Sequence, residues 1–218
     1  MATSYSRWAT HQKCGLKYKF AYVDKIKVDR GEPAPAMVRG SRLHDSAEGY
    51  VLGTGELDPE LSHFAQWLFN LRENYTCHPE RKWAYDLEGN ACEFDDEQAF
   101  LRGIWDLVVE PAEWVEPLDV MEYKTGKIYP DHKKQRYLYG LAGLIHFPEA
   151  ERVRVRTVYF DKKTFHEESW SREELPTMLN DWKNWVDLME MENTWIPNPS
   201  WLCKYCEFSR NKGGPCKF

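Results

Sequence analysis

The sequence has no long apolar run, no internal repeat and no low-complexity tract. No stretch approaches the ~20 consecutive apolar residues that a membrane-spanning helix needs, so we expect no membrane association. It also has no linker rich in Pro, Gly or Ser that is long enough to mark a domain boundary. A chain of 218 residues, 42% hydrophobic and 29% charged, is long enough to bury a core and too apolar to be disordered. We therefore expect one domain over residues 1–218.

The N-terminal residues also lack the basic segment followed by an apolar run that marks a secretory signal. This favours a reducing cytoplasm, in which the six cysteines are not expected to form disulfides. The net charge of −6 does not exclude a nucleic-acid partner. A metal-dependent nuclease needs carboxylates and can gather its basic residues in one cleft, so the overall charge decides little.

Hydrophobic periodicity and turn residues divide the chain into helices and strands. The expected helices, in chain order, cover about 4–14, 39–52, a segment starting at 59, 131–146 and 173–191. The expected strands cover 81–87, 100–109, 118–124 and 153–160, and residues 32–35 are expected to form a loop. Helices, a group of strands, a crossover helix, a strand and a closing helix indicate a mixed α/β domain, with a central sheet flanked by helices.

The segment MEYKTGK at 121–127 carries a carboxylate and an amine on one predicted strand. Glu122 and Lys124 are two residues apart, so both side chains project from the same face. Two charges on the inner face of a core strand need partners, which predicts a cleft that holds a metal ion or a substrate anion. The alternative is an edge strand that carries a solvated ion pair.

The preceding strand carries Asp106 within the apolar segment GIWDLVV, and an isolated buried aspartate is rare. If strands 100–109 and 118–124 form a hairpin, Asp106 and Glu122 converge on one divalent cation. Such an ion polarises a phosphoryl oxygen and lowers the pKa of a bound water molecule, while Lys124 orients that water or neutralises developing charge. These residues predict phosphodiester hydrolysis.

The same residues resemble the PD-(D/E)XK nuclease superfamily, and further segments are similar to its RecB-like branch. GSRLHDSAE resembles the Gly-x-x-x-His element of that branch, with Gly40 and His44 at the motif positions. QRYLYG resembles its Gln-x-x-x-Tyr motif, with Gln135 and Tyr139. The opening helix, which ends in a cysteine before an aromatic and basic run, is also similar, although Gly15 stands where the family often has Pro. The resemblance covers nearly the whole chain.

The resemblance implies a restriction-endonuclease-like core and a set of site residues. The implied ligands of Mg²⁺ or Mn²⁺ are His44, Asp106, Glu122 and the backbone carbonyl of Tyr123. Lys124 would be the catalytic lysine, and Gln135 and Tyr139 would contact the scissile region or the DNA. A lone histidine is more often a satisfied surface or core residue, and glutamine and tyrosine four residues apart often serve packing alone. Glu80 could supply a further carboxylate next to the ligands.

Three cysteines crowd the last sixteen residues, and a fourth precedes the predicted core. The AddB nuclease and small CRISPR-associated nucleases of the RecB-like branch hold a [4Fe-4S] cluster with one cysteine before the core and three after it. The resemblance implies the cluster ligands Cys14, Cys203, Cys206 and Cys216, in a lobe formed by residues 1–22 and 195–218 that joins the two ends of the chain. The last cysteine interval is longer than is usual in the family.

Zinc is the rival of the cluster, because four thiolates suit Zn²⁺ equally well, and a protein without bound metal at these cysteines is a third alternative. The other two cysteines, Cys77 and Cys92, are interpreted as ordinary buried or half-buried thiols. Four aromatic residues flank Cys14 and either stack bases or pack the lobe, and we favour packing: Trp8, Tyr18, Phe20 and Tyr22.

The resemblance implies a metal-dependent deoxyribonuclease, an exonuclease on single-stranded DNA or DNA ends. It would serve recombination, repair, or CRISPR or phage DNA processing in a bacterial, archaeal or phage-infected cell. DNA is the expected partner, and a homo-oligomer or a recombination or CRISPR partner protein stays open. Basic residues near the predicted site could follow the phosphates: Arg39, Arg42, Lys127, Lys133, Lys134 and Arg136. The alternative function is a catalytically silent DNA-binding or assembly module stabilised by a cysteine-bound metal.

Overall fold

The computed structural model describes residues 2–28 and 32–218, and these residues fall into two units. The first unit comprises Ala2 and residues 35–183, and the second comprises residues 3–28, 32–34 and 184–218. Most of the predicted cysteine lobe, residues 3–22 and 195–218, lies in the second unit, which extends further at both boundaries. The assignment of the whole chain to one domain stays a prediction.

A mixed sheet of six strands, in the order β2-β1-β3-β4-β5-β6, forms the centre of the first unit. The strands are β1 (Thr76–Tyr85), β2 (Ala91–Cys92), β3 (Leu101–Glu110), β4 (Leu118–Lys124), β5 (Arg152–Tyr159) and β6 (Thr164–Ser171). All neighbouring strands are antiparallel except β4 and β5, which are parallel. A parallel pair needs a crossover, and helix α5 (His132–His146) supplies it. The predicted mixed α/β fold with helices around a central sheet is confirmed.

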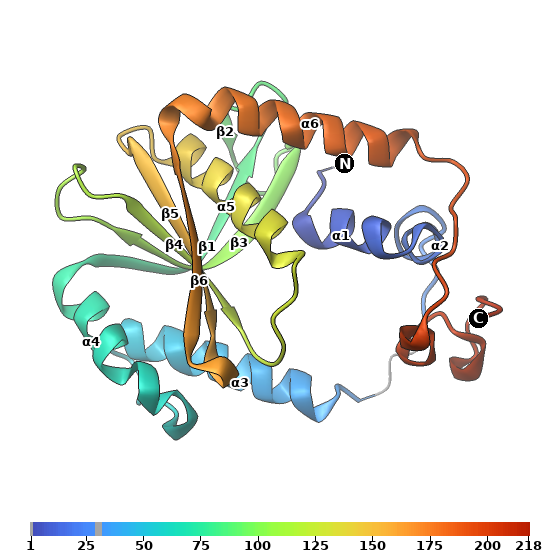
Figure 1. Ribbon diagram of the computed structural model, residues 1–218, viewed down its shortest axis with the longest axis horizontal. Coiled ribbons are helices and arrows are strands. Elements are labelled where there is room, and N and C mark those ends of the chain that lie inside the picture. The colour runs from blue at the N-terminus through green and yellow to red at the C-terminus, as the bar shows by residue number, and fades with distance from the viewer. Residues whose placement is uncertain (1, 29–31) are drawn as a thin grey trace. The chain divides into compact units, whose positions relative to one another are not determined.

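Helices of the first unit cover both faces of this sheet, as Figure 1 shows. Helices α3 (Pro35–Val51) and α4 (Ala65–Asn74), with the 3-10 helix Pro59–Phe64, pack on one face. Their shared core contains residues of both helices and of three strands: Leu43, Ala47, Leu68, Leu107, Met121 and Val158. Helix α5 packs on the other face, where Gly143 lies against Leu118 and Val120. Residues on both faces of β4 are therefore withdrawn from solvent.

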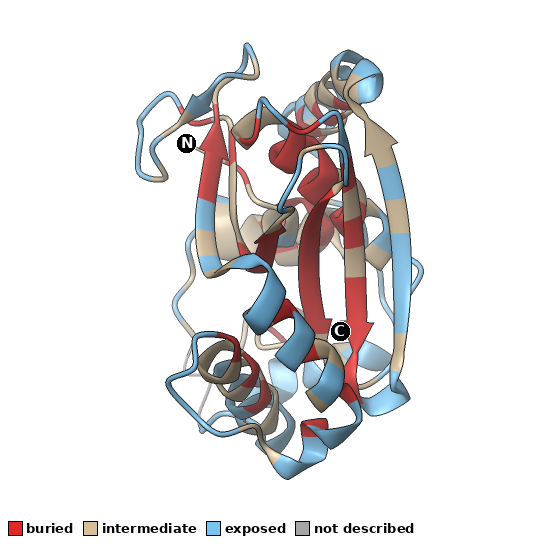
Figure 2. Cartoon of the chain, turned by 90° about the vertical axis from the view of Figure 1, so that its left-hand side faces the viewer, coloured by how far each residue is buried: buried red, intermediate tan, exposed pale blue. Residues whose placement is uncertain are grey.

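Burial is greatest in the central strands, which are largely red in Figure 2. In β4 every residue from Leu118 to Tyr123 is buried, whereas β6 contains no buried residue. Strand β4 lies between β3 and β5. The alternative of a solvated ion pair on an edge strand is therefore wrong for Glu122 and Lys124. Their charges belong to the most buried strand of the sheet.

The second unit has little regular structure. It contains α1 (Tyr5–Lys13), α2 (Gly15–Tyr18), a π-helical turn (Lys19–Val23), the 3-10 turns Trp201–Tyr205 and Arg210–Lys212, and the end of α6 (Leu175–Met191). The Ser4 side chain accepts a hydrogen bond from Arg7 N at 3.3 Å and caps α1. Among the described residues, no helix has the length and apolar content to span a membrane.

Aromatic side chains pack the second unit. The ring of Tyr18 stacks on Trp195 with centroids 5.7 Å apart, and Phe20 lies 5.6 Å from Phe208. Trp8 lies 6.0 Å from Trp185. The aromatic residues around Cys14 therefore pack against the C-terminal segment, as favoured from the sequence.

Several boundaries differ from the prediction. Helix α3 begins at Pro35, four residues before its expected start. The loop expected over residues 32–35 is therefore confined to residues 32–34. Proline suits the first helical position because its missing N–H has no helical partner there. Strand β1 begins at Thr76 and runs through Pro79, and the short β2 and the exposed β6 were not expected.

Candidate active site

The predicted hairpin of β3 and β4 is present, and it brings two carboxylates together. Leu107 pairs with Met121 and Val109 with Asp119 in an antiparallel ladder. Asp106 Oδ2 accepts a hydrogen bond from the backbone N–H of Tyr123 at 2.5 Å. This bond fixes the Asp106 carboxylate beside the residue that follows Glu122. Neighbouring strands thus hold the two predicted acidic ligands.

Helix α3 brings His44 to the same place. His44 Nδ1 lies 3.6 Å from Asp106 Oδ1, and the imidazole meets the Tyr123 ring edge-on, with centroids 5.6 Å apart. Burial opposes protonation of His44, but the hydrogen bond to Asp106 and the charges of Asp106 and Glu122 outweigh it, so its pKa is raised above 6.5. The histidine of the Gly-x-x-x-His element therefore has an acidic partner, and it is not an isolated surface residue.

Glu122 and Lys124 form a half-enclosed ion pair at the end of β4. Lys124 Nζ donates a hydrogen bond to Glu122 Oε1 at 2.5 Å. Burial and the charge of Asp106 raise the pKa of Glu122, while Lys124 acts in the opposite direction. Burial lowers the pKa of Lys124, but the charge and hydrogen bond of Glu122 outweigh it, so that pKa is raised. Lys124 is thus held as a cation, and the carboxyl groups of Asp106 and Glu122 lie close together where solvent access is limited.

The Gln-x-x-x-Tyr pair of α5 lies against these groups. Gln135 Nε2 donates to the Tyr139 hydroxyl at 3.1 Å, and this hydroxyl donates to the Ile104 carbonyl at 3.0 Å. Gln135 and Tyr139 are buried, with exposed fractions of 7% and 6%. The Tyr139 hydroxyl also lies close enough to lower the pKa of Glu122. Both side chains therefore face the site and are not on an outer helix surface.

Glu80 lies opposite Asp106 at an irregular point of the sheet. The β1–β3 register includes Pro79 with Leu107 and Arg81 with Trp105, but skips Glu80 and Asp106. Glu80 has a φ of 48°, in the left-handed region that a non-glycine residue seldom adopts. Its pKa is raised by burial, then by the charge of Asp106. The predicted further carboxylate is therefore near the site, as are Glu48 and Asp45 of α3, which also raise its pKa.

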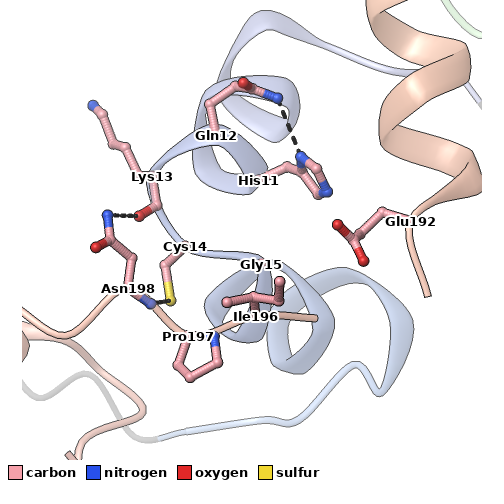
Figure 3. Close-up of a pocket in the computed structure, with 9 residues that line it drawn as sticks. All are labelled: His11, Gln12, Lys13, Cys14, Gly15, Glu192, Ile196, Pro197 and Asn198. Carbon is pink, nitrogen blue, oxygen red and sulfur yellow. Dashed lines mark hydrogen bonds between the residues drawn. The ribbon is translucent and has the colours of Figure 1, made fainter. Parts of the chain in front are cut away.

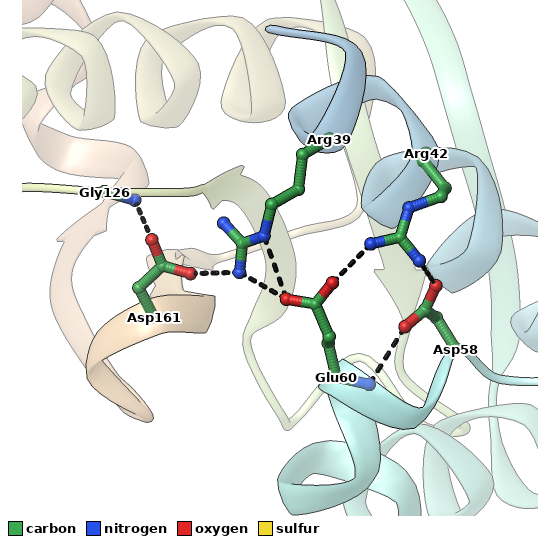
Figure 4. A network of polar contacts seen from close by, with 6 residues as sticks. All are labelled: Arg39, Arg42, Asp58, Glu60, Gly126 and Asp161. Atoms are coloured by element: carbon green, nitrogen blue, oxygen red, sulfur yellow. Dashed lines mark hydrogen bonds and ion pairs between the residues drawn. The ribbon is translucent and has the colours of Figure 1, made fainter. Parts of the chain in front are cut away.

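Figure 4 shows a polar network beside the site that the sequence did not reveal. Asp161, just after β5, accepts a hydrogen bond from Gly126 N at 2.7 Å and from Arg39 at 2.7 Å. Arg39 also donates to Glu60 at 2.6 and 2.8 Å, and Arg42 pairs with Glu60 and Asp58. The network joins the turn after Lys124 to helix α3. The sequence held one signal for Asp161, because it follows the predicted strand at 153–160. Parallel strands end at the same edge of a sheet, so a residue after β5 lies near the end of β4.

This network corrects the expectation that basic residues near the site are free to follow phosphates. Arg39 and Arg42 are held by carboxylates. Arg136 is buried, with 8% exposed, and donates to Glu168 at 2.9 Å and to Thr157 at 3.1 Å. A buried guanidinium with two side-chain partners is not available to a nucleic acid, so the expectation for Arg136 is wrong. Lys133 is exposed, and its Nζ lies 3.4 Å from Glu168.

The donor set at the site suits a divalent cation. Two carboxylates from adjacent strands, one imidazole and the Tyr123 carbonyl are the oxygen and nitrogen ligands that Mg²⁺ or Mn²⁺ accepts. Within residues 2–28 and 32–218, no three His, Cys, Asp or Glu side chains stand in an arrangement ready to hold a metal ion. Burial, and after it the charge of Asp106, raise the pKa of Glu122 although Lys124 lowers it, so a bound cation would favour its ionised form. The residues therefore fit a cation in their chemistry.

The four predicted cluster cysteines all lie in the second unit. A cavity of about 320 Å³ lies beside Cys14, and Figure 3 shows the residues that line it. Cys14 Sγ accepts hydrogen bonds from Lys17 N at 3.4 Å and from Asn198 N at 3.5 Å, and the Asn198 amide donates to the Lys13 carbonyl at 3.0 Å. The segment just before Cys203 is thus bound to Cys14.

The remaining cysteines occupy the turns that follow. Cys203 Sγ accepts from Ser200 N at 3.3 Å, and a hydrogen bond from the Phe208 backbone favours the thiolate of Cys206. Burial nevertheless raises the pKa of Cys206, and the nearby Glu207 and Cys216 act in the same direction. Within residues 2–28 and 32–218, these thiols, like the other potential ligands, form no group that is ready to hold a metal ion. Their chemistry nevertheless fits a thiolate-bound metal, because backbone N–H groups that point at sulfur stabilise its negative charge.

The two other cysteines are half-buried in the first unit. Burial raises the pKa of Cys77 to about 11, which makes it unreactive, and Cys77 packs against the core under α3 and α4. Cys92 lies on the short strand β2. Both belong to the first unit, whereas the four predicted cluster cysteines belong to the second, which agrees with the interpretation of Cys77 and Cys92 as ordinary thiols.

A known family matches almost the whole chain. The profile described as the PD-(D/E)XK nuclease superfamily matches residues 2–210. The chain belongs to the PD-(D/E)XK nuclease superfamily. In this PD-(D/E)XK protein, the residues that the sequence predicts as the motif, Asp106, Glu122 and Lys124, lie within the matched range. Enzymes of the superfamily typically use Mg²⁺ or Mn²⁺.

Two solved structures share the fold of this PD-(D/E)XK protein. The crystal structure of SSO0001 is 16% identical with a TM-score of 0.51, over 99% of this chain and 86% of that one. A protein from Eubacterium rectale, named as a candidate exonuclease, is 11% identical with a TM-score of 0.50, over 94% of this chain and 86% of that one. No curated protein sequence matches the chain. Membership and fold together support nuclease activity in general.

Proposed function

We propose that this chain is a metal-dependent deoxyribonuclease that hydrolyses phosphodiester bonds at the site of His44, Asp106, Glu122 and Lys124. The observation that carries the proposal is the convergence of these residues from α3, β3 and β4. His44 lies 3.6 Å from Asp106, and Lys124 lies 2.5 Å from Glu122. Packing alone does not account for three acidic or imidazole groups and an ammonium placed together on buried elements.

Each side chain has a distinct part in the proposed reaction. His44, Asp106, Glu122 and the Tyr123 carbonyl would hold Mg²⁺ or Mn²⁺, which when bound polarises the phosphoryl oxygen and makes a bound water more acidic. Lys124 offsets the negative charge that grows on the phosphate, because its ammonium is held at the end of β4. Hydrolysis adds hydroxide to phosphorus, breaks the bond to the leaving oxygen, and leaves the proton of water on that oxygen.

Other residues keep these groups in place. The backbone N–H of Tyr123 orients the Asp106 carboxylate. Tyr139 is anchored by Gln135 and by the Ile104 carbonyl, and it limits the positions that Glu122 can take. We therefore propose positioning roles for Gln135 and Tyr139, in addition to any contact with the DNA. Their burial excludes water from one side of the site.

The first experiment measures cleavage of labelled single-stranded DNA with Mg²⁺, with Mn²⁺ and without divalent metal. We expect cleavage that requires metal, and a loss of about 10²–10³-fold or more in Asp106→Asn and Glu122→Gln. Glu110→Gln is the matched control, because Glu110 is a half-buried carboxylate on the same strand as Asp106. Equal rates in the wild type, Asp106→Asn and Glu110→Gln would overturn the proposal.

The proposed substrate is single-stranded DNA or a DNA end, and the proposed action is exonucleolytic. The fold relative named as a candidate exonuclease supports this proposal. A time course on end-labelled linear and on circular single-stranded DNA tests it directly. An exonuclease releases short products from the linear DNA and leaves the circle intact, whereas nicking of the circle shows an endonuclease. An RNA strand of the same sequence tests the preference for DNA.

The cysteines form the second part of the proposal. We propose that Cys14, Cys203, Cys206 and Cys216 hold a [4Fe-4S] cluster, with Zn²⁺ as the rival metal. The backbone N–H groups that point at Cys14 and Cys203 support this assignment. A cluster would give a brown protein that absorbs near 400 nm and yields iron and sulfide on analysis. A colourless protein that contains zinc would establish the rival, and Cys92→Ser is the control that keeps all four ligands.

The sequence-based alternative, a catalytically silent module, makes opposite predictions. Such a module binds DNA and shows no metal-dependent cleavage in the wild type. The hydrogen-bonded Asp106 and the Glu122–Lys124 pair favour the enzyme, because a binding module has no need of charged groups on its most buried strand. We further propose a cytoplasmic location and roles in recombination, repair, or CRISPR or phage DNA processing.

A further inference from the structure

The two units carry charge of opposite sign. Residues 1–2 and 35–183 contain 18 basic and 28 acidic residues, a net charge of −10. Residues 3–34 and 184–218 contain 11 basic and seven acidic residues, a net charge of +4. In the last part of the chain, 193–218, four basic residues accompany a single acidic one. An acidic protein therefore ends in a basic segment.

This basic segment exposes two large aromatic rings. Trp201 is 70% exposed and Tyr205 is 61% exposed. They lie on the 3-10 turn Trp201–Tyr205, and their rings meet edge-on with centroids 6.1 Å apart. In contrast, Trp83, Trp105 and Trp182 are at most 1% exposed. Two adjacent exposed aromatic residues are a surface feature that the packing of the second unit does not explain.

Cations accompany these rings. Lys204 Nζ lies 4.9 Å from the centroid of the Tyr205 ring, and Lys212 Nζ donates to the Tyr205 carbonyl at 3.0 Å. The one acidic residue nearby, Glu207, is paired with Lys17 at 2.9 Å. In the described part of the chain, no carboxylate pairs with Lys204. The first unit differs, because carboxylates hold Arg39, Arg42 and Arg136 there.

We propose that this aromatic–basic surface, formed by Trp201, Lys204, Tyr205 and Lys212, binds single-stranded nucleic acid. Unpaired bases stack on the exposed rings, and the phosphates lie beside the ammonium groups. A duplex keeps its bases inside its own stack, so the surface prefers single strands. The inference deepens the proposed function, on which it rests for the class of ligand. It assigns the second unit a binding role in addition to holding a metal.

Ring substitutions test the stacking. Binding of fluorescein-labelled oligothymidylate to the full chain is measured by anisotropy, without added divalent metal. We expect Trp201→Leu and Tyr205→Leu each to weaken binding about tenfold, since base stacking contributes about 1–3 kcal/mol. Trp201→Phe and Tyr205→Phe keep a ring and should stay within about threefold of the wild type. Leucine keeps apolar surface but has no aromatic face. Comparing the leucine and phenylalanine variants at each position therefore separates base stacking from apolar docking.

Charge is tested by salt dependence. Replacing Lys204 by Gln should reduce the slope of log affinity against log salt by about 0.7, the value for one phosphate contact on a single strand. Phe69→Leu is the matched control, because Phe69 is a 40% exposed aromatic residue of α4 in the first unit. It should bind like the wild type. Circular dichroism and thermal unfolding verify that each variant folds.

Three outcomes would overturn the inference. One is unchanged oligothymidylate binding in both leucine variants. Another is equal weakening by leucine and phenylalanine. The third is capture of the protein by vesicles of phosphatidylcholine and phosphatidylglycerol, lost in Trp201→Leu, without oligonucleotide binding. The proposed nuclease function is tested separately. If the wild type binds oligothymidylate through this surface but never cleaves DNA, the binding inference holds and the nuclease proposal is wrong. If the wild type cleaves DNA but the leucine variants bind normally, the nuclease proposal holds and the binding inference is wrong.

Discussion

The two units of this chain are built on different physical principles. The first unit has a six-stranded sheet with apolar layers on both faces, and its residues near the proposed site are paired with each other. The second has short helices and turns, four cysteines and exposed aromatic rings. Burial of apolar surface can account for the first unit, whereas we propose that the second depends more on a metal held by its four cysteines. The comparison indicates that the units respond to different substitutions.

The largest effect is expected from removing a ligand of the metal that we propose for the second unit. Cys203→Ser removes one proposed metal ligand, and loss of a structural metal site removes on the order of 10 kcal/mol of folding free energy. We expect a protease to cut within residues 184–218 of the variant while it leaves a fragment that contains 35–183. Mass spectrometry of the fragments gives the answer. Cys92→Ser should be as resistant as the wild type, and equal resistance of Cys203→Ser would contradict the proposed metal.

The first unit should instead be sensitive to its packing. A Cβ added at Gly103 would lie 2.5 Å from Cζ2 of Trp83, whose ring is 1% exposed and packs against Trp105. Gly103→Ala should therefore reduce the free energy of unfolding by about 1–3 kcal/mol, measured by urea denaturation. At Gly55 the nearest atoms lie at 3.8 Å, so Gly55→Ala is the control. A Gly103→Ala variant as stable as the control would show that the ring shifts freely.

A smaller effect is expected at Asp161, where charge joins the turn after Lys124 to α3. The hydrogen bond from Arg39 holds the pKa of Asp161 below 3.8, and Gly126 N acts in the same direction. The folded-state pKa is below the unfolded one, so this contribution is complete above about pH 5 and is lost as the pH falls through the folded-state pKa. Asp161→Asn should lose about 0.5–1 kcal/mol at pH 7, discounted for solvent exposure.

Comparing Asp161→Asn with the wild type at several pH values checks this sign. Unfolding midpoints should differ at pH 7 and converge towards pH 3. We also expect a lower kcat with little change in KM, because the turn follows Lys124. A difference that grows as the pH falls would contradict the assignment.

An effect on stability of similar size and opposite sign, with little effect on cleavage, is expected at Gly40. A Cβ there would lie 3.4 Å from Thr125 Oγ1, which is ordinary contact, so a methyl group fits. Gly40→Ala should raise the free energy of unfolding by about 0.5–1 kcal/mol, because alanine favours the helix interior. Cleavage should stay within about threefold of the wild type. A large loss of cleavage with unchanged stability would mean that nucleic acid approaches the backbone at Gly40.

Sequence patterns predicted the buried strands well and the exposed ones poorly. Strands β3 and β4 are rich in apolar residues, β5 alternates charged and apolar residues, and turn residues separate the predicted strands. Strand β6, TFHEESWS, is largely polar, and only its pairing with β5 makes it a strand. Pro79 concealed the start of β1, because proline is rare inside a sheet. It is tolerated there because the described β2 pairs with β1 only at Ala84 and Tyr85, which leaves that side of Pro79 open.

The site was predictable where motif residues share a strand or a helix. Glu122 and Lys124 share a face by spacing alone, and His44 was found by resemblance. Asp161, Arg39 and Glu60 come from three separate elements, and no spacing rule relates them. Arg136 looked like a phosphate ligand in the sequence. Only the fold shows that it is buried and bonded to Glu168 and Thr157.

The sequence by itself determined the fold class, the family and the acidic and lysine residues of the proposed site. These depend on local apolar patterns and short motifs, which the order of residues carries. The tertiary structure alone decided which charges are neutralised and which stay exposed. Arg39 and Arg136 acquire carboxylate partners from remote elements, while Lys204 stands beside exposed rings. The reason is physical: the free energy of a charge depends on its solvent and its neighbours, and folding sets both.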